Sequence, residues 1–209
     1  MVVNKMKINT RSDLITVFNN NIVNNLGVEV GTYAGDFAKE ILNKYTGKLF
    51  LVDTWRHHND DSYIDIANKI DFKEIYTKCS DNIKGYEDRC FMLKIDSKNA
   101  SNLFDDDSLD FVYIDANHKY EAVKEDISCW FPKIRKGGIL SGHDYLIEDS
   151  IFTWNSIQKD EKNKYIFYLE GTFLGEFGVN AAVNEFVQQN NLKLNLTTNE
   201  PFGSWFVFK

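Results

Sequence analysis

Short apolar runs alternate with longer amphipathic stretches along most of the chain. The five runs are Leu26–Val30, Leu49–Val52, Cys90–Ile95, Leu109–Ile114, and a stretch that begins at Gly138–Leu140 and ends near His143 and Asp144. Continuous apolar runs of this length, without polar alternation, are typical of strands that are buried on both faces of a parallel sheet.

Helical spacing separates these runs. In Ala34–Tyr45 and again in Tyr120–Phe131, apolar residues recur every three or four positions, which predicts an amphipathic helix in each segment. A polar, helix-compatible stretch leads up to about Cys79. Alternation of strands and helices predicts a mostly parallel sheet with helices on both faces, the doubly wound arrangement of a Rossmann-like fold.

The last part of the chain has a different pattern. Tyr165–Leu169, Val179–Val187, Leu192–Leu196 and Trp205–Phe208 predict a strand, a helix and two strands that are close in sequence. Strands that follow each other closely pair antiparallel. We therefore expect an α/β fold with a mostly parallel seven-stranded sheet and an antiparallel strand near the C-terminus, in a single domain over residues 1–209 whose first 25 residues form a helical extension.

Acidic residues follow the apolar runs. They are Asp53, Asp96, Asp115 and Asp144, the last after a short turn. The first run contains Glu29, two residues before Gly31. In open parallel sheets, ligands bind beyond the carboxyl ends of the strands, so these carboxylates are candidates for one shared crevice. The alternative is that each Asp caps the following helix, which explains one or two of them more easily than the whole set.

Composition and charge narrow the classes of partner. The 209 residues are 43% hydrophobic and 26% charged, as in an ordinary globular protein. Lys and Arg number 24 against 31 Asp and Glu, which gives a net charge of −7 and disfavours nucleic acid and anionic membranes as partners.

The cellular location is predicted from the absence of targeting and membrane-spanning segments in the sequence. It has no apolar segment of signal-peptide length at residues 1–10 and none long enough to span a bilayer. The three cysteines, an odd number at wide spacing, are typical of reduced thiols rather than disulfides. We expect a cytoplasmic protein that does not insert into membranes; a homodimer is compatible with the sequence.

The turn after the first run carries the motif Glu29-x-Gly31-x-x-x-Gly35. Its spacing differs from the dinucleotide fingerprint G-x-G-x-x-G, and taken alone it is an ordinary βα turn. Together with Val52-Asp53-Thr54-Trp55 and Ile95-Asp96-Ser97, however, it resembles the first motifs of class I S-adenosylmethionine-dependent methyltransferases.

This resemblance implies that Asp53 receives both ribose hydroxyls of the cofactor and that Asp96 and Ser97 lie beside the adenine. The candidate cofactor-binding residues are Glu29, Gly31, Thr32, Tyr33, Gly35, Asp53, Thr54, Trp55, Asp96, Ser97 and Asp115.

A longer set of motifs resembles one branch of that family, which contains catechol and macrolide-sugar O-methyltransferases. The motifs are Leu109–Tyr120, Trp130, Gly137-Gly138, Gly142–Tyr145 and Gly178–Phe186. The branch implies a divalent ion, Mg²⁺ or Mn²⁺, with Asp115 and Asp144 as ligands and His143 as the candidate for a third. A supporting hydrogen bond is the alternative role for His143.

His118, three residues after Asp115, matches the position of the general base in the catechol enzymes. An imidazole can accept a hydroxyl proton near neutral pH, and Asp115 is the second candidate catalytic residue. The alternative is a solvated loop histidine that caps the next helix. The run His57–Asp61 is expected to be a loop or acceptor lid, because adjacent residues of an extended chain point to opposite faces.

The predicted activity is O-methylation of a sugar or glycan hydroxyl. The segments His143–Tyr145 and Val52–Trp55 resemble the sugar-modifying members most, and residues 147–178 are long enough for an acceptor lid. Aromatic candidates for the acceptor wall are Trp55, Tyr120, Tyr145, Trp154 and Phe173. The alternatives are a small-molecule or phenolic O-methyltransferase and a cofactor-binding module without catalysis; Asp115, His118 and Asp144 argue against the module.

Overall fold

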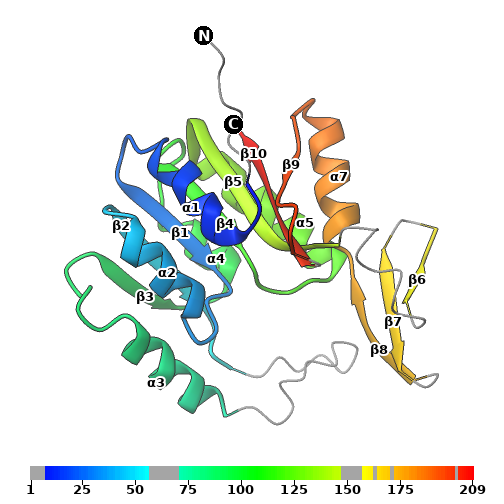
Figure 1. Ribbon diagram of the computed structural model, residues 1–209, viewed down its shortest axis with the longest axis horizontal. Helices are drawn as coiled ribbons and strands as arrows, with labels where there is room; N and C mark the ends of the chain where they lie inside the picture. Colours follow the sequence, from blue (N-terminus) through cyan, green and yellow to red (C-terminus); the bar gives the residue numbers. More distant parts are fainter. Residues whose placement is uncertain (1–7, 57–70, 147–156, 162–163, 170–171, 201) are drawn as a thin grey trace.

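A computed structural model of the chain describes residues 8–56, 71–146, 157–161, 164–169, 172–200 and 202–209, and shows a seven-stranded sheet with helices on both faces (Figure 1). The strands are β1 (Leu26–Val30), β2 (Lys48–Asp53), β3 (Cys90–Lys94), β4 (Leu109–Ile114), β5 (Ile134–Leu146), β9 (Asn195–Leu196) and β10 (Phe202–Phe208). Their order is β3-β2-β1-β4-β5-β10-β9.

The pairing confirms the predicted fold class. The first five strands are parallel, and β10 runs antiparallel to both β5 and β9. Among the described residues, no helix is long and apolar enough to cross a membrane.

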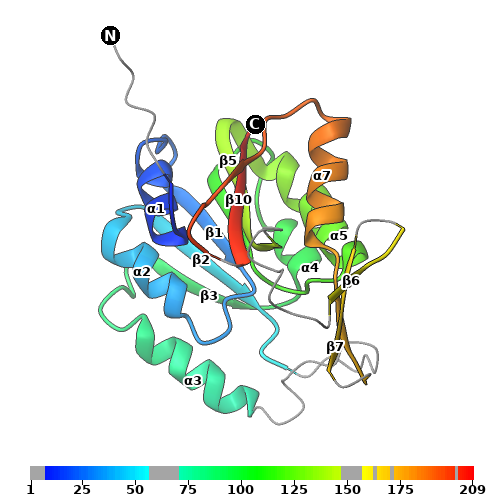
Figure 2. The same ribbon diagram turned by 45° about the vertical axis from the view of Figure 1, so that its right-hand side comes forward.

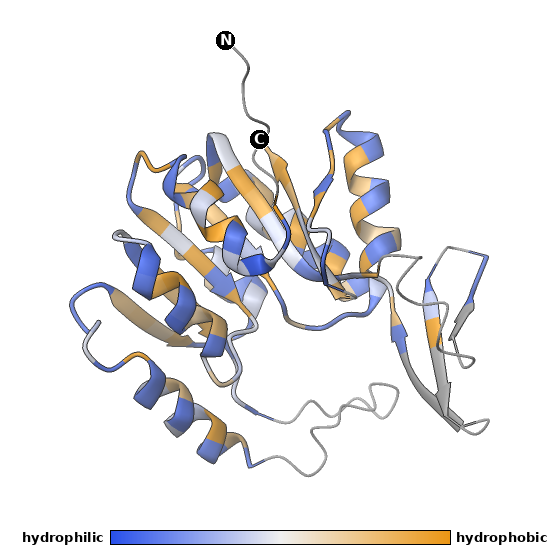
Figure 3. Ribbon diagram, viewed as in Figure 1, coloured by the Kyte–Doolittle hydropathy of each residue, from blue (hydrophilic) through white to orange (hydrophobic). Residues whose placement is uncertain are grey.

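Helices cover the two faces of the sheet as separate layers (Figures 1 and 2). On one face lie α1 (Arg11–Asn19), α2 (Asp36–Lys44) and α3 (Phe72–Asn82), and on the other lie α4 (Ser97–Ser101), α5 (Tyr120–Trp130) and α7 (Val179–Gln189). A short 3₁₀ turn, η2 (Phe131–Lys133), connects α5 to β5. Helices α2 and α3 turn hydrophilic residues outward, and the central strands are largely hydrophobic (Figure 3).

Strand β4 shows why the apolar runs are continuous. All of its residues are buried, because Phe111 and Tyr113 pack under the layer of α1–α3 while Val112 and Ile114 pack under the layer of α4, α5 and α7. A strand that is covered on both faces has no exposed side on which polar residues would alternate.

Asp110 of β4 anchors the segment between α1 and β1. Its buried carboxylate accepts backbone N–H bonds from Val23, Asn24 and Leu26, at 2.9–3.1 Å, and pairs with the Arg135 guanidinium at 2.6 Å. The segment before β1 is thereby held against the amino end of β4.

A second, smaller sheet precedes α7. It consists of β6 (Ile157–Lys159), β7 (Tyr165–Leu169) and β8 (Thr172–Phe177), all antiparallel, and it lies apart from the central sheet (Figures 1 and 2). Tyr165 and Phe177 pack with Leu146 and Phe202 at the ends of β5 and β10. The strand predicted at 165–169 is confirmed, but it belongs to this small sheet, and β8 was not predicted.

Strand boundaries differ from the sequence predictions in two places. β5 begins at Ile134, which pairs with Leu109 of β4; the polar and glycine residues Arg135–Gly138 then form an irregularity, and pairing to β4 resumes at Ile139. Of the predicted strand Leu192–Leu196, only Asn195–Leu196 forms bridges, at the outer edge of the sheet. The predicted loop His57–Asp61 and residues 147–156 of the predicted lid lie outside the described residues.

Candidate active site

Strands β1 and β4 are neighbours in the sheet, and the order of the strands reverses between them, with β2 and β3 beyond β1 and with β5 beyond β4. Open α/β sheets bind ligands beyond the carboxyl ends of the strands at such a point. Gly31 follows β1 with φ +85°, and Asp115 follows β4. A Cβ atom on Gly31 would lie 2.0 Å from the Asp115 carbonyl oxygen. Only glycine fits, so the predicted turn motif is required by the close approach of two backbone segments.

A cavity of about 630 Å³ opens above these strand ends. Nine of the eleven candidate cofactor-binding residues line it, namely Glu29, Gly31, Thr32, Tyr33, Asp53, Thr54, Asp96, Ser97 and Asp115. Gly35 and Trp55 do not line it. Gly35 starts α2 in the left-handed region, at φ +76°, and the buried Trp55 supports the turn from behind by donating its indole N–H to the Tyr33 carbonyl at 2.8 Å.

Asp53 links the turns after β1 and β2. Its Oδ2 accepts the Tyr33 backbone N–H at 2.9 Å, and its Oδ1 accepts the Trp55 backbone N–H at 2.7 Å. Each oxygen of a carboxylate has a further lone pair. The side chain is therefore fixed in orientation and still able to accept two neighbouring hydroxyls from the cavity.

Glu29 is a buried carboxylate without a complete set of partners. Its side chain lines the cavity, the residue is 2% exposed, and its Oε2 atom has no hydrogen-bond partner. Burial, reinforced by the negative charge of Asp115, raises the pKa of Glu29 well above its usual range. A buried polar atom without a partner is costly, so this oxygen is suited to a donor or cation from a ligand.

Asp96 and Ser97 stand at the other end of the cavity, where α4 begins. The Asp96 carboxylate caps that helix by accepting the Asn99 backbone N–H at 3.0 Å, as the helix-cap alternative predicts. Ser97 Oγ accepts the Trp130 indole N–H at 2.8 Å.

Next to them lies Asp126, which sequence reasoning missed. It lines the cavity, is 7% exposed, and burial raises its pKa to about 6. The available signal was an acidic residue beside the apolar face of α5, which includes Val123, Ile127 and Trp130.

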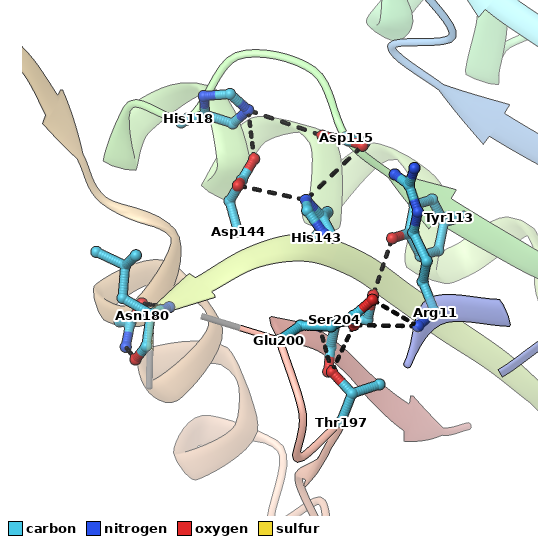
Figure 4. Close-up of polar contacts among 11 residues, drawn as sticks. Arg11, Tyr113, Asp115, His118, His143, Asp144, Asn180, Thr197, Glu200 and Ser204 are labelled. Carbon is cyan, nitrogen blue, oxygen red and sulfur yellow. Dashed lines mark hydrogen bonds and ion pairs between the residues drawn. The ribbon is translucent and has the colours of Figure 1, made fainter. Parts of the chain in front are cut away.

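Four titratable side chains meet where β4 and β5 end (Figure 4). The donor atoms of Asp115, His118 and Asp144 all lie within 4.8 Å of one another. His118 Nε2 is 2.8 Å from Asp144 Oδ2 and 3.8 Å from Asp115 Oδ1. His143 Nδ1 is 3.3 Å from Asp144 Oδ1 and 4.0 Å from Asp115 Oδ2. The two imidazoles thus face different oxygens of the same two carboxylates.

Electrostatics couple these groups. Burial alone would lower the pKa of His118, but the nearby carboxylates of Asp115 and Asp144 outweigh it and raise the pKa to about 10. His143 is shifted upward for the same reasons, with Asp144 as its main partner. Burial opposes ionisation of Asp144, yet the two imidazoles hold its pKa far below the usual range. The carboxylate pair therefore attracts positive charge strongly.

Two features fit a cation at this cluster. His118 Nε2 is buried and makes no aligned hydrogen bond despite its short distance to Asp144. Asp144 adopts φ +58°, a left-handed conformation that is uncommon for residues other than glycine and that concentrates at functional sites. The carboxylate oxygens suit Mg²⁺ or Mn²⁺, and an imidazole nitrogen in the same site shifts the preference towards Mn²⁺ or another transition-metal ion.

The two histidines differ in their relation to the cavity. His118 lies in its wall, on the loop between β4 and α5, where the Gly178 backbone N–H donates to the His118 carbonyl at 2.7 Å and the Phe177 ring stacks on the imidazole at 5.0 Å. His143 is part of β5 and does not line the cavity.

The aromatic residues predicted for the acceptor wall point elsewhere or lie outside the described part of the chain. The Tyr120 hydroxyl bonds to Glu185 and the Tyr145 hydroxyl to Asn184, both on α7. Trp154 and the side chain of Phe173 are outside the described part. Sequence reasoning also missed Arg11, a cavity-lining cation from α1.

The family model described as "Methyltransferase domain" matches residues 28–145, which include the β1 turn, the cavity wall and the acidic cluster. The chain belongs to the class I S-adenosylmethionine-dependent methyltransferases.

Solved structures show the same fold. A Corynebacterium glutamicum protein matches this methyltransferase with a TM-score of 0.60 at 16% identity, over 95% of this chain and 79% of that one. The O-methyltransferase TomG from Streptomyces achromogenes, solved with S-adenosylmethionine, matches with a TM-score of 0.60 at 9% identity, over 94% of this chain and 78% of that one.

A curated relative is far longer. The uncharacterized protein y4gI of Sinorhizobium fredii is 26% identical over 119 residues, which cover 57% of this methyltransferase and 11% of the relative. The chain therefore spans only a small part of that relative's length.

Proposed function

We propose that this methyltransferase transfers the methyl group of S-adenosylmethionine to a hydroxyl of a sugar or glycan, with help from a divalent ion, Mg²⁺ or Mn²⁺. The observation that carries the proposal is the convergence of Asp115, His118, His143 and Asp144 at one end of the cavity.

The charge of the cavity wall supports S-adenosylmethionine as the ligand. The wall has seven carboxylates, Glu29, Asp36, Asp53, Asp96, Asp115, Glu125 and Asp126, against the cations Arg11, Arg56 and Lys98, with His118 as a further titratable group. When bound, S-adenosylmethionine supplies an electrophilic methyl group on a cationic sulfonium. An acidic wall attracts that cation. In the proposal, Asp53 accepts the ribose hydroxyls and Asp96 and Ser97 stand beside the adenine.

Asp115, Asp144 and His143 hold the divalent ion in this proposal. The carboxylates supply hard oxygen donors, and His143 extends from strand β5 toward both of them. When bound, the ion supplies positive charge that makes a neighbouring hydroxyl more acidic. Because Asp115 belongs both to the cluster and to the cavity wall, an acceptor oriented here faces the methyl group.

In this proposal His118 takes the proton from the acceptor hydroxyl when the divalent ion lies on Asp115 and Asp144, because the charge of the ion opposes the protonated imidazole that these carboxylates otherwise favour. It lies in the cavity wall, and Gly178 and Phe177 fix its loop and its ring, so its Nε2 is held in one place beside Asp115. Positioned general bases of this kind contribute about 10²–10⁴-fold to a rate.

A sugar acceptor is supported by the segments Val52–Trp55 and His143–Tyr145, which resemble those of sugar-modifying members of the branch. Vicinal sugar hydroxyls also present two oxygens to one ion, and the acidic cavity wall disfavours an anionic polymer. A catechol presents a similar oxygen pair, so phenols are the comparison class in the test.

The test is transfer of a radiolabelled methyl group to a panel of sugars with vicinal hydroxyls and to catechols, with and without EDTA. We expect labelled sugar in the presence of Mg²⁺ or Mn²⁺ and none in chelator. Labelled catechol alone would contradict the sugar acceptor, full activity in chelator would contradict the ion, and cofactor binding without transfer to any acceptor would contradict catalysis.

A further inference from the structure

Arg11 is a cation in the cavity wall to which the proposed function assigns no role. It is the first residue of α1, it is partly buried, and its guanidinium lies 4.9 Å from the centre of the Phe37 ring. Within the described part of the chain, no carboxylate forms an ion pair with this guanidinium. In Figure 4 the side chain extends toward the side of Asp115.

The position is unfavourable for a purely structural arginine. A cation at a helix N-terminus opposes the helix dipole. The Glu200 carboxylate offsets this by accepting the Arg11 backbone N–H, at 3.1 and 3.0 Å to its two oxygens, and Thr197 donates its hydroxyl to Glu200 at 3.0 Å. The loop between β9 and β10 thus fixes the start of α1, and the guanidinium extends toward the side of Asp115 (Figure 4).

Glu29 and Arg11 are complementary polar groups that lack a full set of partners. Both line the cavity, Glu29 has a buried oxygen without a partner, and Arg11 has no ion-pair partner among the described residues. Their charges influence each other, since the positive charge of Arg11 partly offsets the burial that raises the pKa of Glu29. A ligand with an ammonium and a carboxylate on one carbon would satisfy both.

We propose that Arg11 binds the carboxylate of the amino-acid part of S-adenosylmethionine, with Glu29 facing its ammonium group. The inference rests on the cofactor occupying this cavity, as the proposed function requires. The planar guanidinium suits two parallel hydrogen bonds to a carboxylate, which an ammonium side chain cannot provide. The first helix of the chain is then part of the cofactor site.

Calorimetry with two ligands tests this assignment. S-adenosylhomocysteine has the carboxylate, and 5′-methylthioadenosine has the same adenosine and sulfur without the amino-acid group. Arg11→Met keeps an unbranched stem against Phe37 and should weaken S-adenosylhomocysteine roughly 10- to 100-fold, the range for a hydrogen-bonded charged group. Affinity for 5′-methylthioadenosine should stay within about 2-fold, and Arg11→Lys should lie between wild type and Arg11→Met.

Lys98→Met is the matched control. Lys98 is another cation of the cavity wall, close to Asp96 and paired with Glu125 at 2.8 Å. Its loss should leave the ratio of the two affinities unchanged, which separates a specific contact from the general charge of the cavity.

Three results would overturn the assignment, each in a different way. Equal weakening of both ligands by Arg11→Met would mean that Arg11 only supports the fold of the site. Unchanged S-adenosylhomocysteine affinity with a raised KM for an acidic acceptor would assign Arg11 to the acceptor carboxylate. Failure of the wild-type chain to bind either ligand would remove the cofactor from this cavity and with it the proposed function.

Discussion

At the scale of single residues, Gly31 and Gly85 differ in the space around them. Gly31 and Gly85 both have a positive φ, +85° and +90°, but an added Cβ on Gly85 meets nothing within 4 Å while one on Gly31 meets the Asp115 backbone at 2.0 Å. Gly85→Ala should cost about 1 kcal/mol of backbone strain. Gly31→Ala should cost at least about 3 kcal/mol, because a backbone atom cannot move aside cheaply.

The measurement is denaturant unfolding of both variants, with S-adenosylhomocysteine affinity of any Gly31→Ala protein that folds. Equal stabilities for the two variants would contradict the close approach of β1 and β4 at this turn.

Asp53 carries two functions that one experiment can separate. It orders the turns through Tyr33 and Trp55, and we propose that it also accepts the ribose hydroxyls. Asp53→Ala should weaken S-adenosylhomocysteine by about 1.5–3 kcal/mol, the range for hydrogen bonds to a charged group. The loss should be smaller for the 2′-deoxy analogue, which already lacks one hydroxyl. Calorimetry that gives the same loss for both ligands would leave Asp53 with the ordering function alone.

His118 and His143 form a matched pair for assigning roles. His143→Ala should lower Mn²⁺ affinity roughly 10-fold or more if His143 is the third ligand that we propose. His118→Ala should lower kcat by roughly 10²–10⁴-fold while Mn²⁺ and S-adenosylhomocysteine affinities stay near the wild-type values. Rates and Mn²⁺ titrations on the same preparations check this, and the reverse pattern would exchange the two roles.

At the scale of elements, Asp110 controls how the segment before β1 is attached. Its carboxylate is buried, and although burial opposes ionisation, Arg135 and three backbone N–H groups lower its pKa. Asp110→Asn leaves the Arg135 charge without its partner and should destabilise the fold by about 3–5 kcal/mol. Asp106→Asn, which removes an exposed carboxylate from Lys133, should leave the stability nearly unchanged.

The lowered pKa of Asp110 predicts how the stability of the fold depends on pH. A carboxyl whose pKa is lower in the folded state stabilises it above the pKa of the unfolded chain, near 3.9, and that contribution is lost as pH falls below this value. The stability of the wild-type protein should therefore fall as the pH is lowered below about 5, and Asp110→Asn should show a smaller fall. Urea unfolding over this range measures both; parallel curves for the two proteins would contradict a depressed pKa at Asp110.

Elements could be predicted from the sequence where burial dictates the pattern. Strands β1 to β4 and helices α2, α5 and α7 are covered by the sheet or by neighbouring layers, so their apolar periodicity is clear. Strand β8 and the first part of β5 escaped prediction. Pairing with β7 makes β8 extended, and β5 crosses an irregularity at Arg135–Gly138, where local propensity argues against a strand.

At the scale of the whole molecule, the candidate site was partly predictable for the same reason. Residues at strand ends follow directly from the strand pattern, and nine of the eleven predicted cofactor residues line the cavity. Arg11 and Asp126 reach the cavity from helices on opposite faces of the sheet. No local pattern relates such residues to the site, because only the packing of α1 and α5 against the sheet brings them there.

We propose that the cofactor cavity and a divalent-ion site adjoin at the ends of β4 and β5. Bound Mn²⁺ broadens the proton signals of nearby groups, and the effect falls steeply with distance. The direct test is the NMR spectrum of S-adenosylhomocysteine bound to the chain with Mn²⁺, compared with the diamagnetic Mg²⁺ form. Asp144→Asn serves as the variant without the ion site, and Asp106→Asn, on the exposed surface, serves as its control.

We predict strong broadening of the protons next to sulfur, weaker broadening of the adenine protons, and loss of both effects in Asp144→Asn while the ligand stays bound. Asp106→Asn should behave as wild type. Unbroadened signals from S-adenosylhomocysteine that is bound to the wild-type chain in the presence of Mn²⁺ would contradict a divalent-ion site beside the cofactor.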